Sequence, residues 1–277
     1  MRDFLHHKAN RLWIVLSGFF IANALIAEFM GVKLFSLEKN LGLREAQWMI
    51  FGEKRSFTLT AGVLLWPVVF VMTDVINEYF GRRGVRMLSY LAAGLIAYGF
   101  VMLFWAMNLQ PADFWRTAHI DPTLDEAARA EKLRLVGDYN EAYRVVFGQS
   151  LWIIVGSLVA FLVSQIVDVA TFHRIKRVTG EGKLWMRATG STLVSQLIDS
   201  FVVVFIALYL GLQLPFSAVL SISVINYLYK GIVAVLLTPV IYVLHIAIDR
   251  YLGKELAEEM KRSALSSSPS RVFPPRE

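Results

Sequence analysis

The chain has 277 residues, of which 56% are hydrophobic and 18% are charged, and its mean hydropathy is +0.52. This balance excludes an ordinary soluble domain, which carries more charge and shorter apolar runs. The net charge of +6 suits topology signals and contacts with lipid headgroups in so apolar a chain, so we predict no nucleic-acid partner. The chain has no cysteine, which excludes disulfides, thiolate nucleophiles and Cys-ligated metals.

Six apolar runs are long enough to cross a bilayer as helices. Each approaches or exceeds the roughly 20 residues that a spanning helix needs. They lie at 12–30, 57–77, 87–109, 151–172, 189–212 and 222–248. The runs are continuous rather than alternating, which favours helices over membrane strands. The predicted fold class is therefore all-α integral membrane, a six-transmembrane-helix bundle.

Three of these runs carry special residues. The first follows a short basic N-terminus and continues past the triplet Ala22-Asn23-Ala24, so we expect an uncleaved first helix rather than a signal peptide. The second contains Pro67 and the sixth contains Pro239. Because a membrane helix tolerates proline at the cost of a bend, both prolines predict kinks.

Basic residues predict the orientation. With the N-terminus inside, the inner segments hold most of the Lys and Arg, and the segment between the fourth and fifth runs contributes Arg174, Lys176, Arg177, Lys183 and Arg187. Such a bias places both termini in the cytoplasm. We expect a multi-pass membrane protein.

Two regions lie outside the apolar runs. The long outer loop at 108–150 contains a turn and helix start near Asp121, followed by a charged helical pattern to about Leu135. A solvated helix is the simpler interpretation of this loop, and a lid or partner contact is the alternative. We therefore divide the chain into a six-helix transmembrane domain at 1–250 and a cytoplasmic tail at 251–277, disordered from Ser263 onward.

The same polar signature occurs in two adjacent runs. Ser164-Gln165-Ile166-Val167-Asp168 lies in the fourth and Ser195-Gln196-Leu197-Ile198-Asp199 lies in the fifth, 31 residues later. A carboxylate is costly at membrane depth, so its presence there usually serves a function. The pattern predicts a polar site between helices.

Four runs each present one polar pair at helical spacing, so that both members share a face. In lipid these faces must point into the bundle or toward water. The pairs are Asp74 with Glu78, Gln165 with Asp168, Gln196 with Asp199, and Asn226 with Lys230.

A structural interpretation stands beside the functional one. Asp199 and Lys230 could form an ion pair that only locks two helices, although a buried ion pair is weak evidence of stability. Glu78 could be interfacial, and Asp74 could bind hydroxyls such as that of Thr73. The functional interpretation is that Lys230 keeps a carboxylate ionised while the other groups bind a polar ligand.

Carboxylates accept hydrogen bonds, and amides both donate and accept them. These groups match the edge of a guanine-like base, which carries an amino group and a ring N–H. Sugars and basic amines would fit the same groups. Aromatic residues that could stack on a flat ring are Trp66, Trp152, Phe161, Phe201 and Tyr227. We therefore expect a planar, nucleobase-like substrate and no cofactor.

Enzymatic and metal chemistry have little support. His245 has no second histidine at metal-ligand spacing, and there is no Walker-type phosphate loop. An aspartyl dyad of Asp199 with Asp74 or Asp168, or a Ser–His dyad of Ser195 or Ser200 with His245, leaves an intramembrane enzyme as a minor alternative. We predict that the protein is not an enzyme and binds no metal.

These residues also carry a family resemblance. Thr73 to Gly81, the two Ser-Gln-x-x-Asp segments and Tyr227 to Lys230 together resemble the queuosine precursor transporter family, also called the vitamin uptake transporter family. The resemblance covers about 12–244. It implies a bacterial inner-membrane protein that imports 7-deazaguanine precursors of queuosine, a modified tRNA base. The longer outer loop at 108–150 departs from the family pattern.

The resemblance also implies site residues. Gln165, Asp168, Gln196, Asp199 and Lys230 would bind the substrate, and Asn226 joins them because it shares a helix face with Lys230. Asp74 and Glu78 would form a gate or proton site, and Asn23 and Lys33 match the first-helix pattern less closely. The alternative function is the substrate-binding subunit of an energy-coupling-factor importer, which would need ATPase partners. The energy source, the exact deazapurine and a homo-oligomeric state stay open at this stage.

Overall fold

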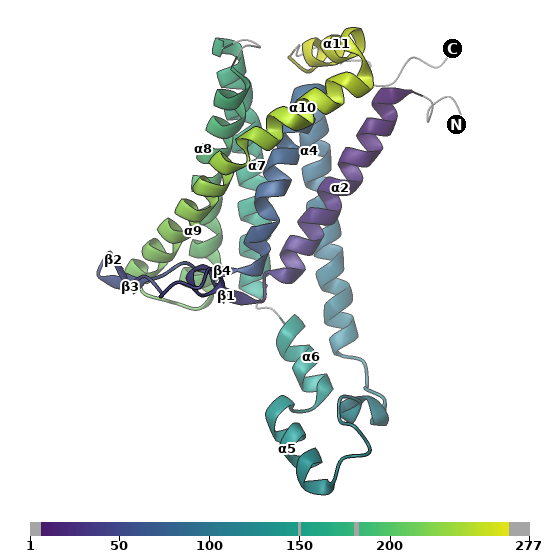
Figure 1. Ribbon diagram of the computed structural model, residues 1–277, viewed down its shortest axis with the longest axis vertical. Coiled ribbons are helices and arrows are strands. Elements are labelled where there is room, and N and C mark those ends of the chain that lie inside the picture. The colour runs from purple at the N-terminus through teal and green to yellow at the C-terminus, as the bar shows by residue number, and fades with distance from the viewer. Residues whose placement is uncertain (1–6, 149–150, 180–182, 266–277) are drawn as a thin grey trace.

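The computed structural model describes residues 7–148, 151–179 and 183–265. It is a bundle of long helices with two small two-stranded sheets, one of them a β-hairpin, at one end (Figure 1). The long helices are α2 (Lys8–Met30), α4 (Trp66–Met107), α7 (Leu151–Thr179), α8 (Leu184–Val204) and α9 (Phe216–Leu236). A π-helical segment, η3 (Phe205–Gly211), continues α8.

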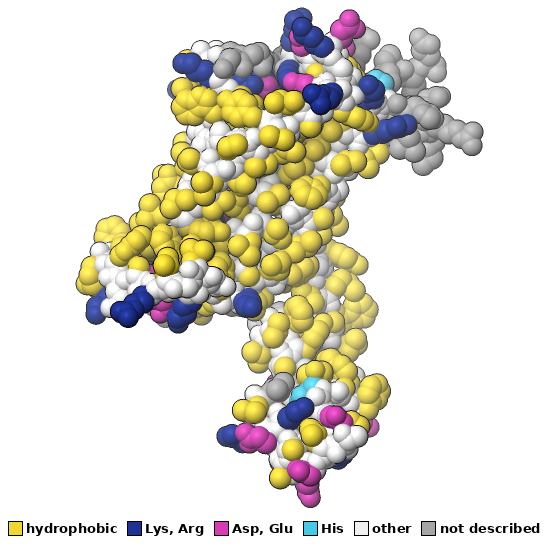
Figure 2. Space-filling view, in the orientation of Figure 1, with side chains coloured by type: hydrophobic (Ala, Val, Ile, Leu, Met, Phe, Trp, Pro, Cys, Tyr) yellow, Lys and Arg dark blue, Asp and Glu magenta, His cyan; other side chains and the backbone are white. Residues whose placement is uncertain are grey.

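The bundle is that of an integral membrane protein. In the described part of the chain, five helical stretches are long and apolar enough to span a bilayer, and they contain α2, α4, α7, α8 with η3, and α9. Hydrophobic side chains cover the outside of the bundle, whereas charged side chains gather at its ends (Figure 2). Such a surface matches a hydrocarbon environment between two polar interfaces.

The longest of these helices, α4, is a hairpin. Gly81 has φ 69° and ψ −174°, which interrupts the helix. Thr73 and Ser89, each eight positions from Gly81, both donate to Gln165 Oε1, at 3.2 and 3.5 Å. In one continuous helix these two residues would be roughly 24 Å apart. The two arms of α4 therefore lie side by side, as Figure 1 shows, and correspond to the predicted runs 57–77 and 87–109.

Neither proline bends the interior of a helix, so the predicted kinks are wrong in detail. Residues before Trp66 form a strand, β4 (Thr58–Thr60), and a 3-10 turn, η1 (Ala61–Leu64), which leaves Pro67 in the first turn of α4. Pro239 lies in the first turn of α10 (Thr238–Leu252), because the predicted run 222–248 breaks after α9. Proline fits a first turn because the N–H that it lacks would have no helical partner there.

The two small sheets were not predicted, and they cover the bundle end where α2 finishes. Strand β1 (Leu34–Ser36) pairs antiparallel with β4, and β2 (Trp48–Ile50) pairs antiparallel with β3 (Glu53–Arg55). A short helix, α3 (Leu37–Asn40), links them. Arg55 Nε donates to Ser221 Oγ at 2.7 Å, and Ser217 Oγ donates to Glu53 at 3.3 Å. These bonds attach β3 to the start of α9.

The outer loop is partly helical and projects away from the bundle (Figure 1). It contains η2 (Asp113–Thr117), α5 (Glu126–Val136) and α6 (Tyr139–Phe147). Asp125 accepts a hydrogen bond from the Ala128 N–H and so caps α5.

The opposite end of the bundle is covered by α11 (Lys254–Leu265). Lys261 binds Asp249 at 2.7 Å, and Ala264 packs against Gly81 at the α4 turn. Disorder was predicted from Ser263 onward; α11 continues to Leu265, and the remaining predicted tail at 266–277 lies outside the described residues.

Gly81→Ala is expected to destabilise the hairpin. A side chain disfavours this positive φ, and a Cβ at Gly81 would lie 3.0 Å from the Ala264 carbonyl oxygen. We expect a loss of about 1–3 kcal/mol in the free energy of unfolding, measured by denaturation in detergent. Gly94→Ala is the matched control, because Gly94 is helical and has no atom within 4 Å of an added Cβ. Equal stability of the two variants would contradict a tight turn at Gly81.

Candidate functional site

A large cavity opens at the β-hairpin end of the bundle. Its volume is about 810 Å³, which lies in the usual range for small-molecule sites. The wall combines apolar residues such as Trp66 with a small set of polar side chains from several elements: Glu28, Arg55, Ser157, Asp199, Asn226 and Lys230.

An ion pair lies in this cavity. Lys230 Nζ on α9 donates to Asp199 Oδ2 on α8, and the side chains are 7% and 14% exposed. Ser164 Oγ on α7 lies 3.4 Å from the other oxygen of Asp199. The pair and the Ser164 contact therefore join three helices, α7, α8 and α9.

A second carboxylate faces the same cavity from α2. Glu28 is only 6% exposed and accepts a 2.7 Å hydrogen bond from Ser157 on α7. Asn226 Nδ2 donates to the Ile222 carbonyl one turn earlier in α9. The cavity thus offers two carboxylates and an amide beside Lys230, and its rim also carries Lys54, Arg55 and several hydroxyl side chains.

A separate cluster of charges is buried between α4, α7 and α8. Glu78 Oε1 accepts from Lys176 Nζ at 2.8 Å and from Arg187 Nη2 at 2.9 Å. None of the three side chains is more than 3% exposed. Beside them, Asn77 Oδ1 and His173 Nε2 are 2.8 Å apart. This network ties three helices together at the end that holds the Gly81 turn.

Two further acids bind hydroxyl groups of α8. Asp74 accepts from Ser191 at 3.4 Å and from Thr192 at 3.3 Å, and Asp168 accepts from Ser195 at 3.0 Å. Both acids are at most 1% exposed. They form a layer of hydrogen bonds that joins α4 and α7 to α8.

The structure distributes the predicted site residues over different surroundings. Asp199, Asn226 and Lys230 line the large cavity. The others have separate contacts. Asp74 and Asp168 bind α8 hydroxyls, and Glu78 binds Lys176 and Arg187. Gln165 binds Thr73 and Ser89, whereas Asn23 donates to the Phe19 carbonyl of its own helix. Gln196 is 2% exposed, and its Oε1 has no partner among the described residues.

Other predicted groups also separate. Among the five aromatic residues proposed for stacking, Trp66 is the one found in the described wall of the cavity. Ser195 binds Asp168, whereas His245 Nδ1 lies 2.9 Å from the Ile241 carbonyl oxygen. Asp199 binds Lys230 and Ser164. These contacts place the members of the considered Ser195–His245 dyad in different networks.

Sequence reasoning missed three charged residues of these clusters. Glu28 interrupts an apolar run, and that interruption is the signal that was available. Lys176 and Arg187 were assigned to an inner loop as topology signals, but α7 extends to Thr179 and α8 begins at Leu184. Both side chains are buried against Glu78, so the assignment of these two residues to the loop is corrected.

Residues 60–244, which carry most of both clusters, match the sequence model of the family described as "Putative vitamin uptake transporter". The "Probable queuosine precursor transporter" of Bacillus subtilis (strain 168) is 31% identical over 187 residues, which are 67% of this chain and 71% of that protein. The protein of the same name from Haemophilus influenzae is 25% identical over 66% of each chain. The "Queuosine precursor transporter" of Escherichia coli (strain K12) is 24% identical over 76% of this chain and 82% of its own length. No solved structure matches the chain.

Glu78→Gln is expected to destabilise the protein by about 3 kcal/mol or more, because it leaves two buried cations without their carboxylate. Lys176→Met should cost less, since the Glu78–Arg187 pair stays intact. Chemical unfolding in detergent measures both.

Glu258→Gln is the matched control. Its partner Arg262 is 3.6 Å away, and both side chains are more than half exposed. The loss of this pair should change stability by less than about 1 kcal/mol. Similar losses for Glu78→Gln and Glu258→Gln would argue against the buried network.

Proposed function

Because the chain belongs to the vitamin uptake transporter family, we propose that it is a membrane transporter that imports a queuosine precursor, a 7-deazaguanine. The names of its bacterial relatives support this substrate class and a bacterial cytoplasmic membrane. The observation that carries the proposal is the Asp199–Lys230 pair, which faces a cavity of about 810 Å³ between apolar helices.

The cavity has the chemistry to bind the polar edge of a deazaguanine. Asp199 and Glu28 accept hydrogen bonds from the amino and ring N–H groups, as carboxylates do when they recognise bases. Asn226 fixes the orientation of the ring, and Trp66 supplies a flat surface against which it packs. Lys230 pairs with Asp199 in the empty site and so holds this carboxylate in place as an acceptor for the substrate.

The remaining predicted residues receive roles outside direct binding. Asp168 and Gln196 are buried between α7 and α8, and we assign them to the alignment of these helices behind the cavity. Gln165 holds the two arms of α4 together through Thr73 and Ser89.

Glu78 and Asp74 form the proposed gate. They lie on the α4 arm that leads to Gly81, where Lys176, Arg187 and the α8 hydroxyls bind them. The cavity, in contrast, reaches Arg55 and the β-hairpin at the other end. A site open on one side and sealed on the other is what alternating access requires. Release of the substrate then needs these buried contacts to separate.

We propose six membrane crossings with both termini in the cytoplasm. The two arms of α4 supply two crossings, α2, α7 and α8 supply three, and α9 supplies the last. The arginines that follow Gly81 and those at the end of α7 then lie on the cytoplasmic side, as the positive-inside rule expects. In this orientation the cavity mouth faces outward, toward the incoming substrate.

Uptake depends on the cavity pair. In cells without queuosine synthesis and without their own importer, the chain should restore queuosine in tRNA when a deazaguanine precursor is supplied. Asp199→Asn combined with Lys230→Gln removes both charges, so neither is left unpaired in the bundle. We expect at least a tenfold loss of tRNA modification, roughly the value of one charge-assisted hydrogen bond.

Lys254→Gln on α11 is the control, with modification near the wild-type level. A folded double variant with full activity would refute the site. Activity of wild-type protein only together with added ATPase subunits would instead favour the energy-coupling-factor alternative, and purified chain alone in liposomes tests this directly.

The topology predicts the behaviour of reporter fusions. Alkaline phosphatase, which is active only outside the cytoplasm, should be active when inserted after Gly137 in the outer loop and inactive when fused after Leu265. A fluorescent protein that folds only in the cytoplasm should give the opposite pattern. Activity of the phosphatase at both positions would contradict the three crossings, α7, α8 and α9, that the proposed topology places between them.

A further inference from the structure

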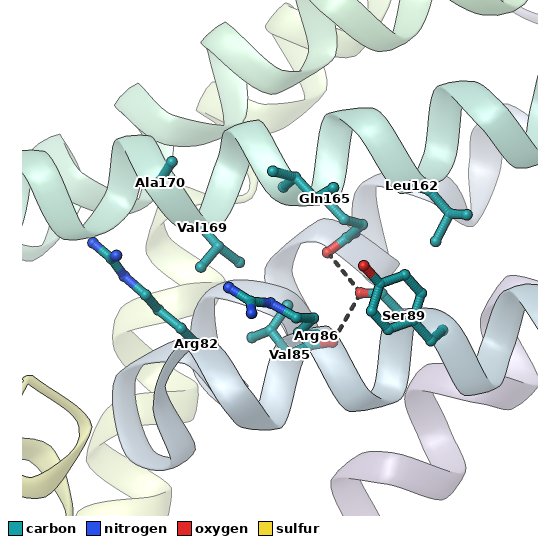
Figure 3. A pocket seen from close by; sticks show the side chains of 10 residues that line it. Arg82, Val85, Arg86, Ser89, Leu162, Gln165, Val169 and Ala170 are labelled. Atoms are coloured by element: carbon teal, nitrogen blue, oxygen red, sulfur yellow. Dashed lines mark hydrogen bonds between the residues drawn. The ribbon is translucent and has the colours of Figure 1, made fainter. Parts of the chain in front are cut away.

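A second, smaller pocket lies between the second arm of α4 and α7, apart from the large cavity. Its volume is about 100 Å³. Figure 3 shows Arg82, Arg86 and Ser89 on the α4 arm and Gln165 and Val169 on α7 along its walls. The pocket begins near the Gly81 turn and continues along both helices toward Leu162.

One end of this pocket is strongly basic. Arg82 and Arg86 line it and are exposed, and the positive charge of Arg177 on α7 acts on Arg82 as well. No ion pair between described residues neutralises Arg82, Arg86 or Arg177. Exposed arginines avoid hydrocarbon, so they place this end at the membrane–water interface. An anion is the natural complement of this group.

The inner part of the pocket holds a buried donor without a partner. Gln165 is 2% exposed, and its Oε1 accepts from Thr73 and Ser89. Its amide nitrogen Nε2 has no hydrogen-bond partner among the described residues. An acceptor from a bound molecule would satisfy this amide nitrogen.

The outer wall of the pocket is apolar and open to the surroundings of the bundle. Ile166 is 57% exposed and Tyr90 is 55% exposed, and Leu162 lies one turn further along α7. The distance along α7 from Ala170 to Leu162 is roughly 12 Å, from eight residues at 1.5 Å each. Over about this length the lining of the pocket changes from the basic end, through the buried amide of Gln165, to an apolar strip.

We propose that this pocket binds an anionic phospholipid. The phosphate lies between Arg82 and Arg86, an ester carbonyl accepts from Gln165 Nε2, and the acyl chain packs on Ile166 and Leu162. Arginine is suited to phosphate because its planar group donates two parallel hydrogen bonds. A free phosphate would satisfy the arginines but would leave both Gln165 and the apolar strip unmatched. This site is independent of the proposed transport function.

The test uses the full-length protein in a neutral detergent with phosphatidylglycerol or phosphatidylcholine of identical acyl chains. Lipid retained by the protein is counted by native mass spectrometry. Wild type should retain phosphatidylglycerol over phosphatidylcholine, and Arg82→Gln with Arg86→Gln should reduce this preference roughly tenfold. Arg83→Gln with Arg174→Gln is the matched control: it removes the same charge from exposed arginines of the same two helices that do not line the pocket.

Three results would overturn the proposal. One is an equal loss in both double variants, which would show general attraction to a basic surface. Another is displacement of phosphatidylglycerol by millimolar inorganic phosphate, which would identify a free anion site. The third is equal retention of ester-linked and ether-linked phosphatidylglycerol, because only the ester carbonyl can accept from Gln165. The proposal predicts weaker retention of the ether lipid by wild type and no such difference in Gln165→Leu.

Discussion

Within a bilayer a charged side chain must find its partner inside the protein, and this constraint shapes the whole bundle. Glu78 binds two cations, Asp199 binds one, and Asp74 and Asp168 bind hydroxyl groups of α8. Every one of these contacts joins different helices. Because the surrounding lipid offers no replacement for water, the polar residues determine which helix faces approach one another.

The two charge clusters make the bundle asymmetric. At the Gly81 end, the Glu78 network lies between the helices, and the side chains of Glu78, Lys176 and Arg187 are almost fully buried. At the β-hairpin end, the Asp199–Lys230 pair faces an open cavity instead. The same type of interaction is thus sealed between helices at one end and borders an open cavity at the other. Buried ion pairs contribute little net stability, which is consistent with the roles in binding and gating proposed above.

Much of the fold could be predicted because membrane helices have a strong local signal. The lengths of the apolar runs indicated α2, α7 and α8, and the polar pairs indicated which faces point inward. The short strands at 34–60 had no comparable signal in the sequence. A strand of three residues is too short to show an alternating hydrophobic pattern, and these strands depend on tertiary contacts such as Arg55 with Ser221. The prolines were misplaced because hydropathy does not distinguish the first turn of a helix from its interior.

The sequence by itself determined the class of protein, the approximate helices, the residues that cannot face lipid and, through its resemblance, the family. Only the tertiary structure decided how those polar residues are grouped. It separated Asp199, Asn226 and Lys230 from Gln165, Asp168 and Gln196, and it joined Glu78 to Lys176 and Arg187. The physical reason is that helical spacing specifies the face of one helix, whereas the partner of that face depends on rotation, depth and the turn at Gly81. Those quantities are set by packing across the whole bundle rather than by any local segment.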